Sequence, residues 1–223
     1  GEKGGVGKSL VARLLAQYLI DHDRPLLGFD TDRSHGALMR FYADYASPAL
    51  VDNVTALDAI IEAAVDQPQR CIVVDLAAQT HAPLAQWMED TGVLSLAAEL
   101  GLRLHYWHVM DCGRDAVDLL ATVLDRFGAD INYVLVRNEV RGGDFRLLDG
   151  SAALARALEL GARTVRLKRL HENAINKIDA ASCSFWRAVT ASGPAGAGLG
   201  LMDRQRVKIW LRDAYGELAA LGI

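Results

Sequence analysis

The chain begins with a glycine- and lysine-rich stretch, Gly-Glu-Lys-Gly-Gly-Val-Gly-Lys-Ser, which constrains its fold more than any other segment. Glycines let successive backbone N–H groups turn inward around an anion. Apolar residues with helical spacing follow directly, at Leu10, Val11, Leu14, Leu15, Tyr18 and Leu19. Such a loop leads into a helix N-terminus, where free N–H groups and the helix dipole both attract negative charge. The stretch therefore predicts a phosphate-binding loop, and a chance glycine-rich turn is the alternative.

The second half of this stretch matches the end of the G-x-x-x-x-G-K-[ST] phosphate loop. In that pattern the lysine, here Lys8, reaches the β- and γ-phosphates of a nucleotide, and the hydroxyl of Ser9 binds Mg²⁺. Glu2 stands where the first glycine of the pattern is expected, and a second lysine, Lys3, lies five residues before Lys8. The loop is therefore a variant of the common form.

Short apolar runs alternate with helical stripes along the rest of the chain. This alternation predicts an α/β fold with a doubly wound, mostly parallel sheet and helices on both faces, in a single domain over 1–223. We expect strands over 25–29, 71–76, 102–110, 131–136 and 164–167, and helices over 54–65, 82–89, 93–100, 115–127, 151–160, 171–189 and 203–221. Residues 33–52 read as a switch-like loop with some helix, and the glycine-rich 191–200 as a flexible tether. A phosphate loop normally follows a buried strand, so we also expect a strand before Gly1.

Size, charge and cysteine content exclude several classes of protein. A net charge of −4 over 223 residues argues against a constitutively basic nucleic-acid binder. The cysteines Cys71, Cys112 and Cys183 are scattered, which argues against a disulfide framework, a zinc site or a cluster site. No apolar run approaches the roughly 20 residues that span a bilayer, and no signal peptide is visible. We therefore expect a cytoplasmic protein.

Three aspartates follow predicted strands, where α/β sheets bind their ligands. Asp75 ends the apolar run Ile72-Val73-Val74, and Asp30 and Asp32 follow the run that ends at Phe29. Asp75 is placed like the acid that holds Mg²⁺ in phosphate-loop NTPases. The alternative for Asp75 is a helix-capping or loop aspartate, and the alternative for Asp30 is a residue that caps a turn. Phosphoryl transfer depends on positioning and on neutralised charge, so acids at these strand ends are what that chemistry requires.

The two lysines of the loop, together with the Asp30-Thr31-Asp32 segment, resemble the ParA/MinD group of ATPases. The resemblance implies binding of ATP and Mg²⁺ and slow ATP hydrolysis. It implies that Lys3 crosses a dimer interface to the partner's nucleotide, that Asp30 supports the water shell of the metal, and that Asp32 orients the attacking water. It implies Ser9, Asp30 and Asp75 as the metal site, and Lys3, Lys8 and Asp32 as the catalytic residues. The nucleotide-binding set is Gly4, Gly5, Val6, Gly7, Lys8, Ser9, Leu10 and Asn138, the last as a base-contacting amide or, alternatively, a turn cap.

Two segments depart from this group. The group often continues with proline and glutamine after the second switch aspartate, whereas this chain has Arg33-Ser34-His35. Arg33 and His35 either touch a phosphate or are solvated loop residues. The residues after Asp75 are Leu76-Ala77-Ala78-Gln79, where the group often has proline or glycine.

Two further segments have a composition that suits contact with a partner. Members of this group bind DNA nonspecifically through basic residues, and a basic cluster here comprises Arg163, Arg166, Lys168 and Arg169. A solvated face is the alternative for this cluster. The last predicted helix carries an apolar stripe through Val207, Trp210, Leu211 and Leu218. That stripe suits packing on the protein's own core better than the membrane association of some relatives.

Within the group, the chain resembles most the TraL-type proteins of conjugative plasmids, through the loop, the switch and the segment Met-Asp-Arg-Gln-Arg-Val-Lys-Ile over 202–209. The resemblance implies a switch that forms a homodimer on binding ATP and positions or recruits a protein partner in plasmid transfer or partition. The alternative is a metabolic ATP-dependent enzyme of the dethiobiotin-synthetase type, which would need no lysine acting across a dimer. An ATPase that delivers metals or clusters would need cysteine pairs that this chain lacks.

Overall fold

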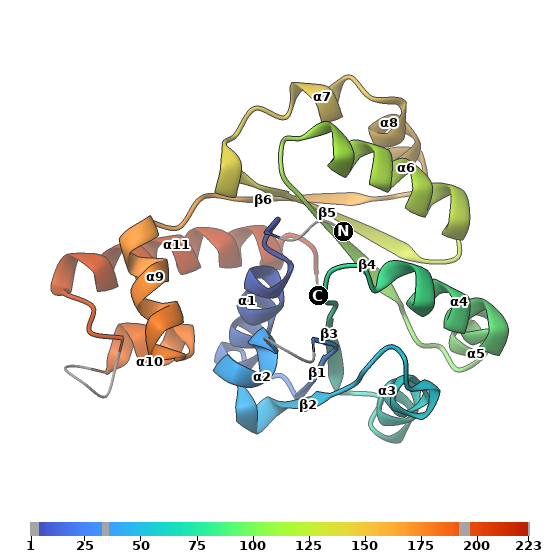
Figure 1. Ribbon diagram of the computed structural model, residues 1–223, viewed down its shortest axis with the longest axis horizontal. Coiled ribbons are helices and arrows are strands. Elements are labelled where there is room, and N and C mark those ends of the chain that lie inside the picture. Colours follow the sequence, from blue (N-terminus) through green and yellow to red (C-terminus); the bar gives the residue numbers. More distant parts are fainter. Residues whose placement is uncertain (1–4, 33–35, 192–196, 223) are drawn as a thin grey trace. The chain divides into compact units, whose positions relative to one another are not determined.

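A computed structural model describes residues 5–32, 36–191 and 197–222 of the chain. These residues form helices and parallel strands that divide into two compact units (Figure 1). Unit 1 contains residues 1–7, 78–169 and 217–223, and unit 2 contains residues 8–77 and 170–216. The boundary between the units falls within the predicted phosphate loop, between Gly7 and Lys8.

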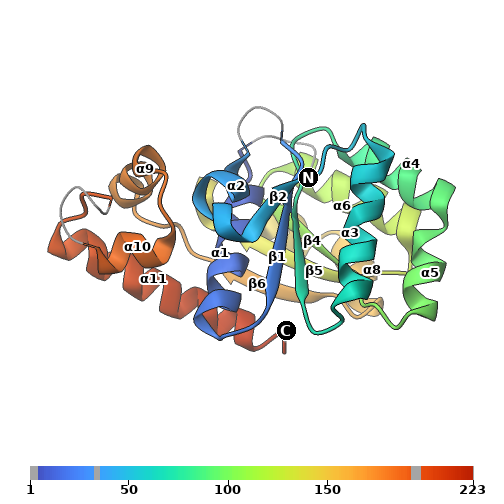
Figure 2. The same ribbon diagram turned by 90° about the horizontal axis from the view of Figure 1, so that it is seen from below.

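Unit 2 is built on a parallel sheet with the strand order β2-β1-β3. Its strands are β1 (Leu26–Asp30), β2 (Ala46–Pro48) and β3 (Cys71–Asp75). Helices α1 (Lys8–Asp21) and α3 (Val54–Asp66) lie on opposite sides of β1 and β3 in both ribbon views (Figures 1 and 2). The remaining helices are α2 (Ala37–Phe41), η1 (Ala43–Tyr45), α9 (Glu172–Ala181), α10 (Phe185–Thr190) and α11 (Leu201–Ala219).

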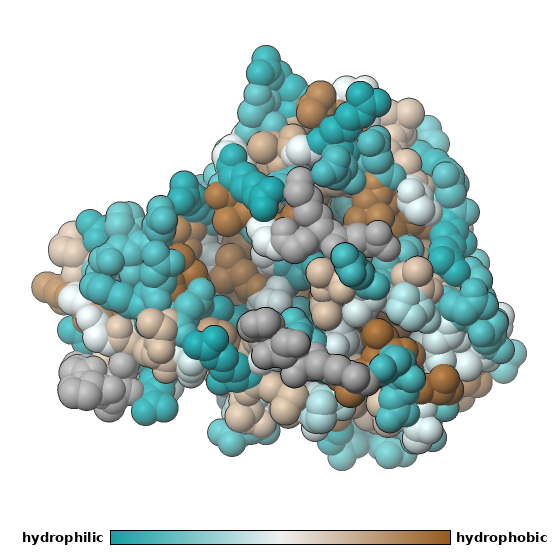
Figure 3. Space-filling view, in the orientation of Figure 1, coloured by the Kyte–Doolittle hydropathy of each residue, from teal (hydrophilic) through white to brown (hydrophobic). Residues whose placement is uncertain are grey.

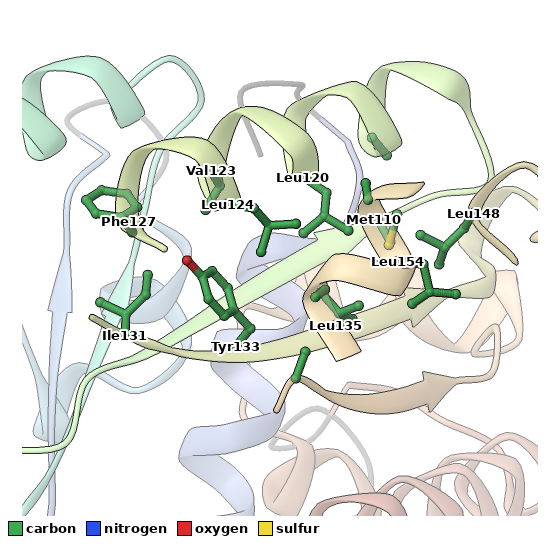
Figure 4. Close-up of a cluster of buried hydrophobic side chains, with 14 of the residues drawn as sticks. Met110, Leu120, Val123, Leu124, Phe127, Ile131, Tyr133, Leu135, Leu148 and Leu154 are labelled. Atoms are coloured by element: carbon green, nitrogen blue, oxygen red, sulfur yellow. The ribbon is translucent and has the colours of Figure 1, made fainter. Parts of the chain in front are cut away.

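Unit 1 is built on a second parallel sheet with the order β4-β5-β6. Its strands are β4 (His105–Met110), β5 (Asn132–Asn138) and β6 (Arg163–Leu167). Its helices are α4 (His81–Thr91), α5 (Val93–Glu99), α6 (Arg114–Phe127), η2 (Glu139–Arg141), α7 (Arg146–Asp149) and α8 (Ala152–Glu159). Leucine and aromatic side chains of α6 pack onto the face of β4 and β5, with Leu120, Leu124 and Leu135 fully buried (Figure 4).

Local signals place the helix ends of unit 1. The side chain of Ser151 caps α8 by accepting a hydrogen bond from the backbone N–H of Leu154, at 3.1 Å. Gly128 ends α6 with a φ of +48°, as expected for a glycine that closes a helix.

Hydrophobic and hydrophilic residues are interspersed on the face shown in Figure 3.

The expected α/β class and parallel strand pairing are confirmed, and the doubly wound arrangement stays an expectation. Two local expectations are wrong. The 33–52 segment contains a short edge strand, β2, in addition to helix. The helix expected over 171–189 is two helices, because Ser182 adopts a left-handed φ of +48° that ends α9 and Ser184 caps the start of α10.

The last helix, α11, buries the expected stripe, including Val207, Trp210, Leu211 and Leu218. That burial agrees with packing on the protein's own core. Within the described residues, no helix is long and apolar enough to cross a membrane. Residues 192–196 of the expected tether lie outside the described residues.

Candidate functional site

The start of α1 and the carboxyl ends of β1 and β3 bring five of the predicted site residues together in unit 2. These residues are Lys8, Ser9, Asp30, Asp32 and Asp75. The strands β1 and β3 pair in register, with Asp30 opposite Asp75. Both carboxylates are almost fully buried, at 1% and 4% exposure. A buried cluster of acids with this geometry needs positive charge from elsewhere.

Asp75 has the environment of a cation ligand. Burial, together with the nearby negative charge of Asp30, raises its pKa to about 7. A hydrogen bond from the Ser9 hydroxyl and the charge of Lys8 act in the opposite direction. The Asp75 Oδ1 atom is buried with no hydrogen-bond partner. A buried carboxylate oxygen without a donor fits a bound cation, because a metal ion would supply the charge that the protein does not.

Lys8 lies in the same cluster and is only partly exposed. Burial lowers its pKa, and the neighbouring Asp75 carboxylate partly reverses this shift. A partly desolvated ammonium beside the acids, at the first turn of a 14-residue helix, is suited to a phosphate anion.

Asp30 is already engaged in the protein. Its Oδ1 accepts a hydrogen bond from the Asp32 backbone N–H at 3.0 Å, and its Oδ2 accepts one from the Met39 N–H at 3.1 Å. Each carboxylate oxygen has a second lone pair, so Asp30 can also bind a metal-bound water. These bonds agree with the turn-capping alternative for Asp30, and its role at a metal stays a prediction.

Thr31 joins the two strand ends. Its backbone N–H and its hydroxyl both donate to the Asp75 carbonyl, at 3.0 and 3.1 Å, and its hydroxyl accepts from the Ala77 N–H at 2.8 Å. An open pocket of about 310 Å³ lies beside it, lined by Thr31, Leu50, Val51 and Asp52. Sequence reasoning missed this role. The only available signal was a small hydroxyl residue between two strand-end acids.

Unit 1 carries Gly5, Val6 and Gly7 of the predicted loop. Gly5 and Gly7 have φ angles of +79° and +97°, which glycine adopts readily and other residues rarely do. The Asn138 side chain donates to the Val6 carbonyl at 2.8 Å and is buried. In this structure the amide therefore supports the loop, and its base-contacting role stays a prediction. Lys3 and Gly4, as well as Arg33 and His35, lie outside the described residues.

Arg141 is a cation beside the loop that sequence reasoning missed. A Cβ atom built on Gly5 would lie 3.2 Å from Arg141 Nη2, so a side chain there would require Arg141 to shift by a few tenths of an ångström, in addition to the strain of the positive φ. The buried Asp111, at the end of β4, accepts from Arg141 Nη1 at 3.2 Å and from the Gly113 N–H at 3.0 Å. No motif links Asp111 to Arg141, because they come from different strand ends.

Arg163 and Arg166 of the predicted basic cluster are bonded inside unit 1. Arg163 donates to the Leu221 carbonyl, and Arg166 pairs with Glu139. The Arg166 backbone N–H also donates to Glu217 Oε2 at 2.8 Å.

Among the described residues, no group of three or more acidic, histidine or cysteine side chains is arranged to hold a metal ion alone. A cation at Asp75 would therefore need ligands from the hydroxyl of Ser9, water or a bound phosphate.

No family model matches the chain. It is similar to protein MobD of Acidithiobacillus ferrooxidans, with 28% identity over 170 residues that cover 74% of this chain and 73% of that protein. It is also similar to a protein TraL of Escherichia coli, with 25% identity over 99% of this chain and 95% of that protein. A second TraL of Escherichia coli is 25% identical over 97% of this chain and 93% of its own length. These similarities support the expected TraL-like relationship.

Proposed function

We propose that this chain is a Mg-ATP-dependent switch that hydrolyses ATP slowly and, in its ATP form, pairs with a second copy and recruits a protein partner in plasmid transfer. The observation that carries the proposal is the buried acid cluster around Asp75, whose Oδ1 atom has no hydrogen-bond partner, beside Lys8 and Ser9 at the first turn of α1. The similarity to proteins TraL and MobD supports the proposed role in plasmid transfer.

Each residue has a role in this proposal. Lys8 neutralises the β- and γ-phosphates, and the N–H groups at the start of α1 and of the glycine loop bind the remaining phosphate oxygens. Ser9 and Asp75 hold Mg²⁺, with Asp30 bound to its water shell. The metal, when bound, neutralises the charge that develops on the phosphates. Asp32 orients the attacking water, and Lys3 of each copy reaches the nucleotide of the other.

The proposal is tested by size-exclusion chromatography with light scattering on the full chain, with Mg-ATP, with Mg-ADP and without nucleotide. We expect a dimer with Mg-ATP only. Asp32→Ala should stabilise the dimer because it slows hydrolysis, and Lys3→Ala should abolish the dimer while ATP still binds. A chain that hydrolyses ATP but stays a monomer under every condition would overturn the switch and favour a metabolic ATP-dependent enzyme. A chain that does not bind ATP at all would overturn both.

A further inference from the structure

Helix α2 is attached at its first turn to the acid cluster. The Met39 N–H, in the first turn of α2, donates to Asp30 Oδ2 at 3.1 Å. Gly36, which precedes α2, lies so close that a Cβ atom there would be 3.2 Å from the same oxygen. The position of α2 therefore depends on where the Asp30 carboxylate is held.

The last turn of α2 is attached to the end of α9. Arg40 donates from Nε to Ser182 Oγ at 2.6 Å and from Nη2 to the Asp179 carbonyl at 2.7 Å. A cation is favoured there because the carbonyl groups at a helix C-terminus carry partial negative charge. The Arg13 guanidinium, which stacks 3.5 Å from the ring centroid of Phe41, also pairs with Asp179 Oδ1 at 2.8 Å. These contacts join α1, α2 and α9.

The residue after α2 holds the start of α10. The Tyr42 hydroxyl accepts from the Phe185 N–H at 3.3 Å and donates to Gln17 Oε1 at 3.0 Å. Gln17 Oε1 also accepts from the Trp186 N–H at 2.9 Å. The first two N–H groups of α10 are thus bound by side chains from α1 and from the end of α2, and both side chains are buried. A shift of α2 would remove hydrogen bonds that the first turn of α10 cannot replace within itself.

We propose that α2 couples the nucleotide site to the α9–α10 pair. This inference rests on the proposed function, because the signal begins when Mg-ATP draws the Asp30 carboxylate toward the metal's water shell. The Met39 N–H, bonded to Oδ2, follows the carboxylate, so α2 moves, and the contacts of Arg40 and Tyr42 with α9 and α10 rearrange. The two positions of α2 form a two-state element that the nucleotide biases. The surface of α10, where Trp186 is 58% exposed, then differs between the nucleotide states.

Tryptophan fluorescence of the full chain tests the coupling, with nucleotide binding followed separately by calorimetry. Of the four tryptophans, Trp186 is the exposed one, while Trp87 and Trp210 are buried and Trp107 is half-buried. The difference between wild type and Trp186→Phe therefore isolates the signal of Trp186. We expect a nonhydrolysable Mg-ATP analogue to change this signal, and Mg-ADP to change it at least twofold less.

Arg40→Ala should bind the analogue within threefold of the wild-type affinity while its Trp186 response falls at least twofold. Arg212→Ala is the matched control, because Arg212 is an exposed arginine of α11 that pairs with its neighbour Asp213. It should respond as the wild type does. Thermal melts of both variants check that each is folded.

The outcomes separate the two proposals. If calorimetry shows binding but the Trp186 signal does not change, the coupling is overturned and the nucleotide site stands. The same holds if Arg40→Ala responds as fully as Arg212→Ala. If calorimetry shows no binding of ATP or its analogue to the wild type, the proposed function is overturned, and the coupling with it.

Discussion

Each of the two sheets has a buried aspartate at the carboxyl end of one strand. The surroundings of the two aspartates neutralise their charge differently. In unit 1, Asp111 at the end of β4 is paired with Arg141 and accepts a backbone N–H. In unit 2, Asp75 at the end of β3 has one oxygen without a partner, and burial raises its pKa to about 7. The comparison distinguishes an acid that is paired within the protein from an acid with one unbonded oxygen, where we propose that a cation binds. A buried charge with its own partner is structural, whereas an uncompensated one indicates a binding site.

The largest effect should come from the lysine beside the acid cluster. Lys8→Ala removes the ammonium that we propose binds the phosphates, and with it the positive charge that lowers the pKa of Asp75 among the described residues. We expect Mg-ATP affinity to fall by roughly 100-fold, since loss of one partner of a desolvated charge contact costs about 2–5 kcal/mol. Calorimetry measures this. The exposed Lys208 provides the control variant, Lys208→Ala, and an equal loss in that variant would contradict the assignment.

The comparison between the two acids predicts stability changes of opposite sign. Asp75→Asn removes an unfavourable buried charge, so at pH 8 we expect the free energy of unfolding to rise by about 1 kcal/mol. Asp111→Asn breaks the pair with Arg141, so we expect a fall of about 2 kcal/mol. Urea denaturation without nucleotide measures both.

The same pair of variants separates binding from stability. Asp75→Asn, although more stable, should lose the Mg²⁺ dependence of ATP binding. The fold raises the pKa of Asp75, so it favours the protonated carboxyl. The stability that this protonated form contributes is lost as pH rises from about 4 to about 7. A destabilised Asp75→Asn at pH 8 would show that this carboxylate is a structural group.

Unit 1 also contains a buried base that should make its stability depend on pH. His108 is fully buried, its Nε2 lies 2.9 Å from the Ala116 carbonyl, and burial lowers its pKa to about 4. The unfolded chain takes up a proton near pH 6.5 and the native chain does not, so stability is full above that pH and falls as pH drops toward 4. We expect a loss on the order of 2 kcal/mol by pH 5.

Urea denaturation of His108→Leu between pH 7.5 and 5 measures this effect. The variant should be less stable than the wild type at pH 7.5 but should depend less steeply on pH. His171→Leu, at an exposed histidine, is the control and should keep the wild-type slope. A wild-type slope in His108→Leu would assign the acid sensitivity to another group.

The strand-end aspartates could be predicted from the sequence because the pattern that reveals them, an apolar run followed by an acid, lies within a few consecutive residues. An apolar run such as 72–74 predicts a strand, and the polar residue that follows it lies at the carboxyl end of that strand. The edge strand β2 was missed because it has three residues, including a proline, and no apolar alternation. The break at Ser182 was missed because the helical pattern continues across it. Asp111–Arg141 and Gln17–Tyr42 join distant segments, so no local pattern reveals them.

The smallest effect should come from a charge that is already paired at the surface. Arg166 is largely exposed and bonded to Glu139, and such pairs contribute less than about 1 kcal/mol. We therefore expect Arg166→Gln to lower the free energy of unfolding by about 0.5 kcal/mol. It should also leave any DNA affinity at low salt within twofold, because the guanidinium is committed inside unit 1. Fluorescence anisotropy with a labelled duplex measures this, with Glu139→Gln as the companion variant that releases Arg166. A tenfold loss of DNA affinity in Arg166→Gln would instead place this arginine on the phosphate backbone, and would make the basic cluster a second ligand site in unit 1.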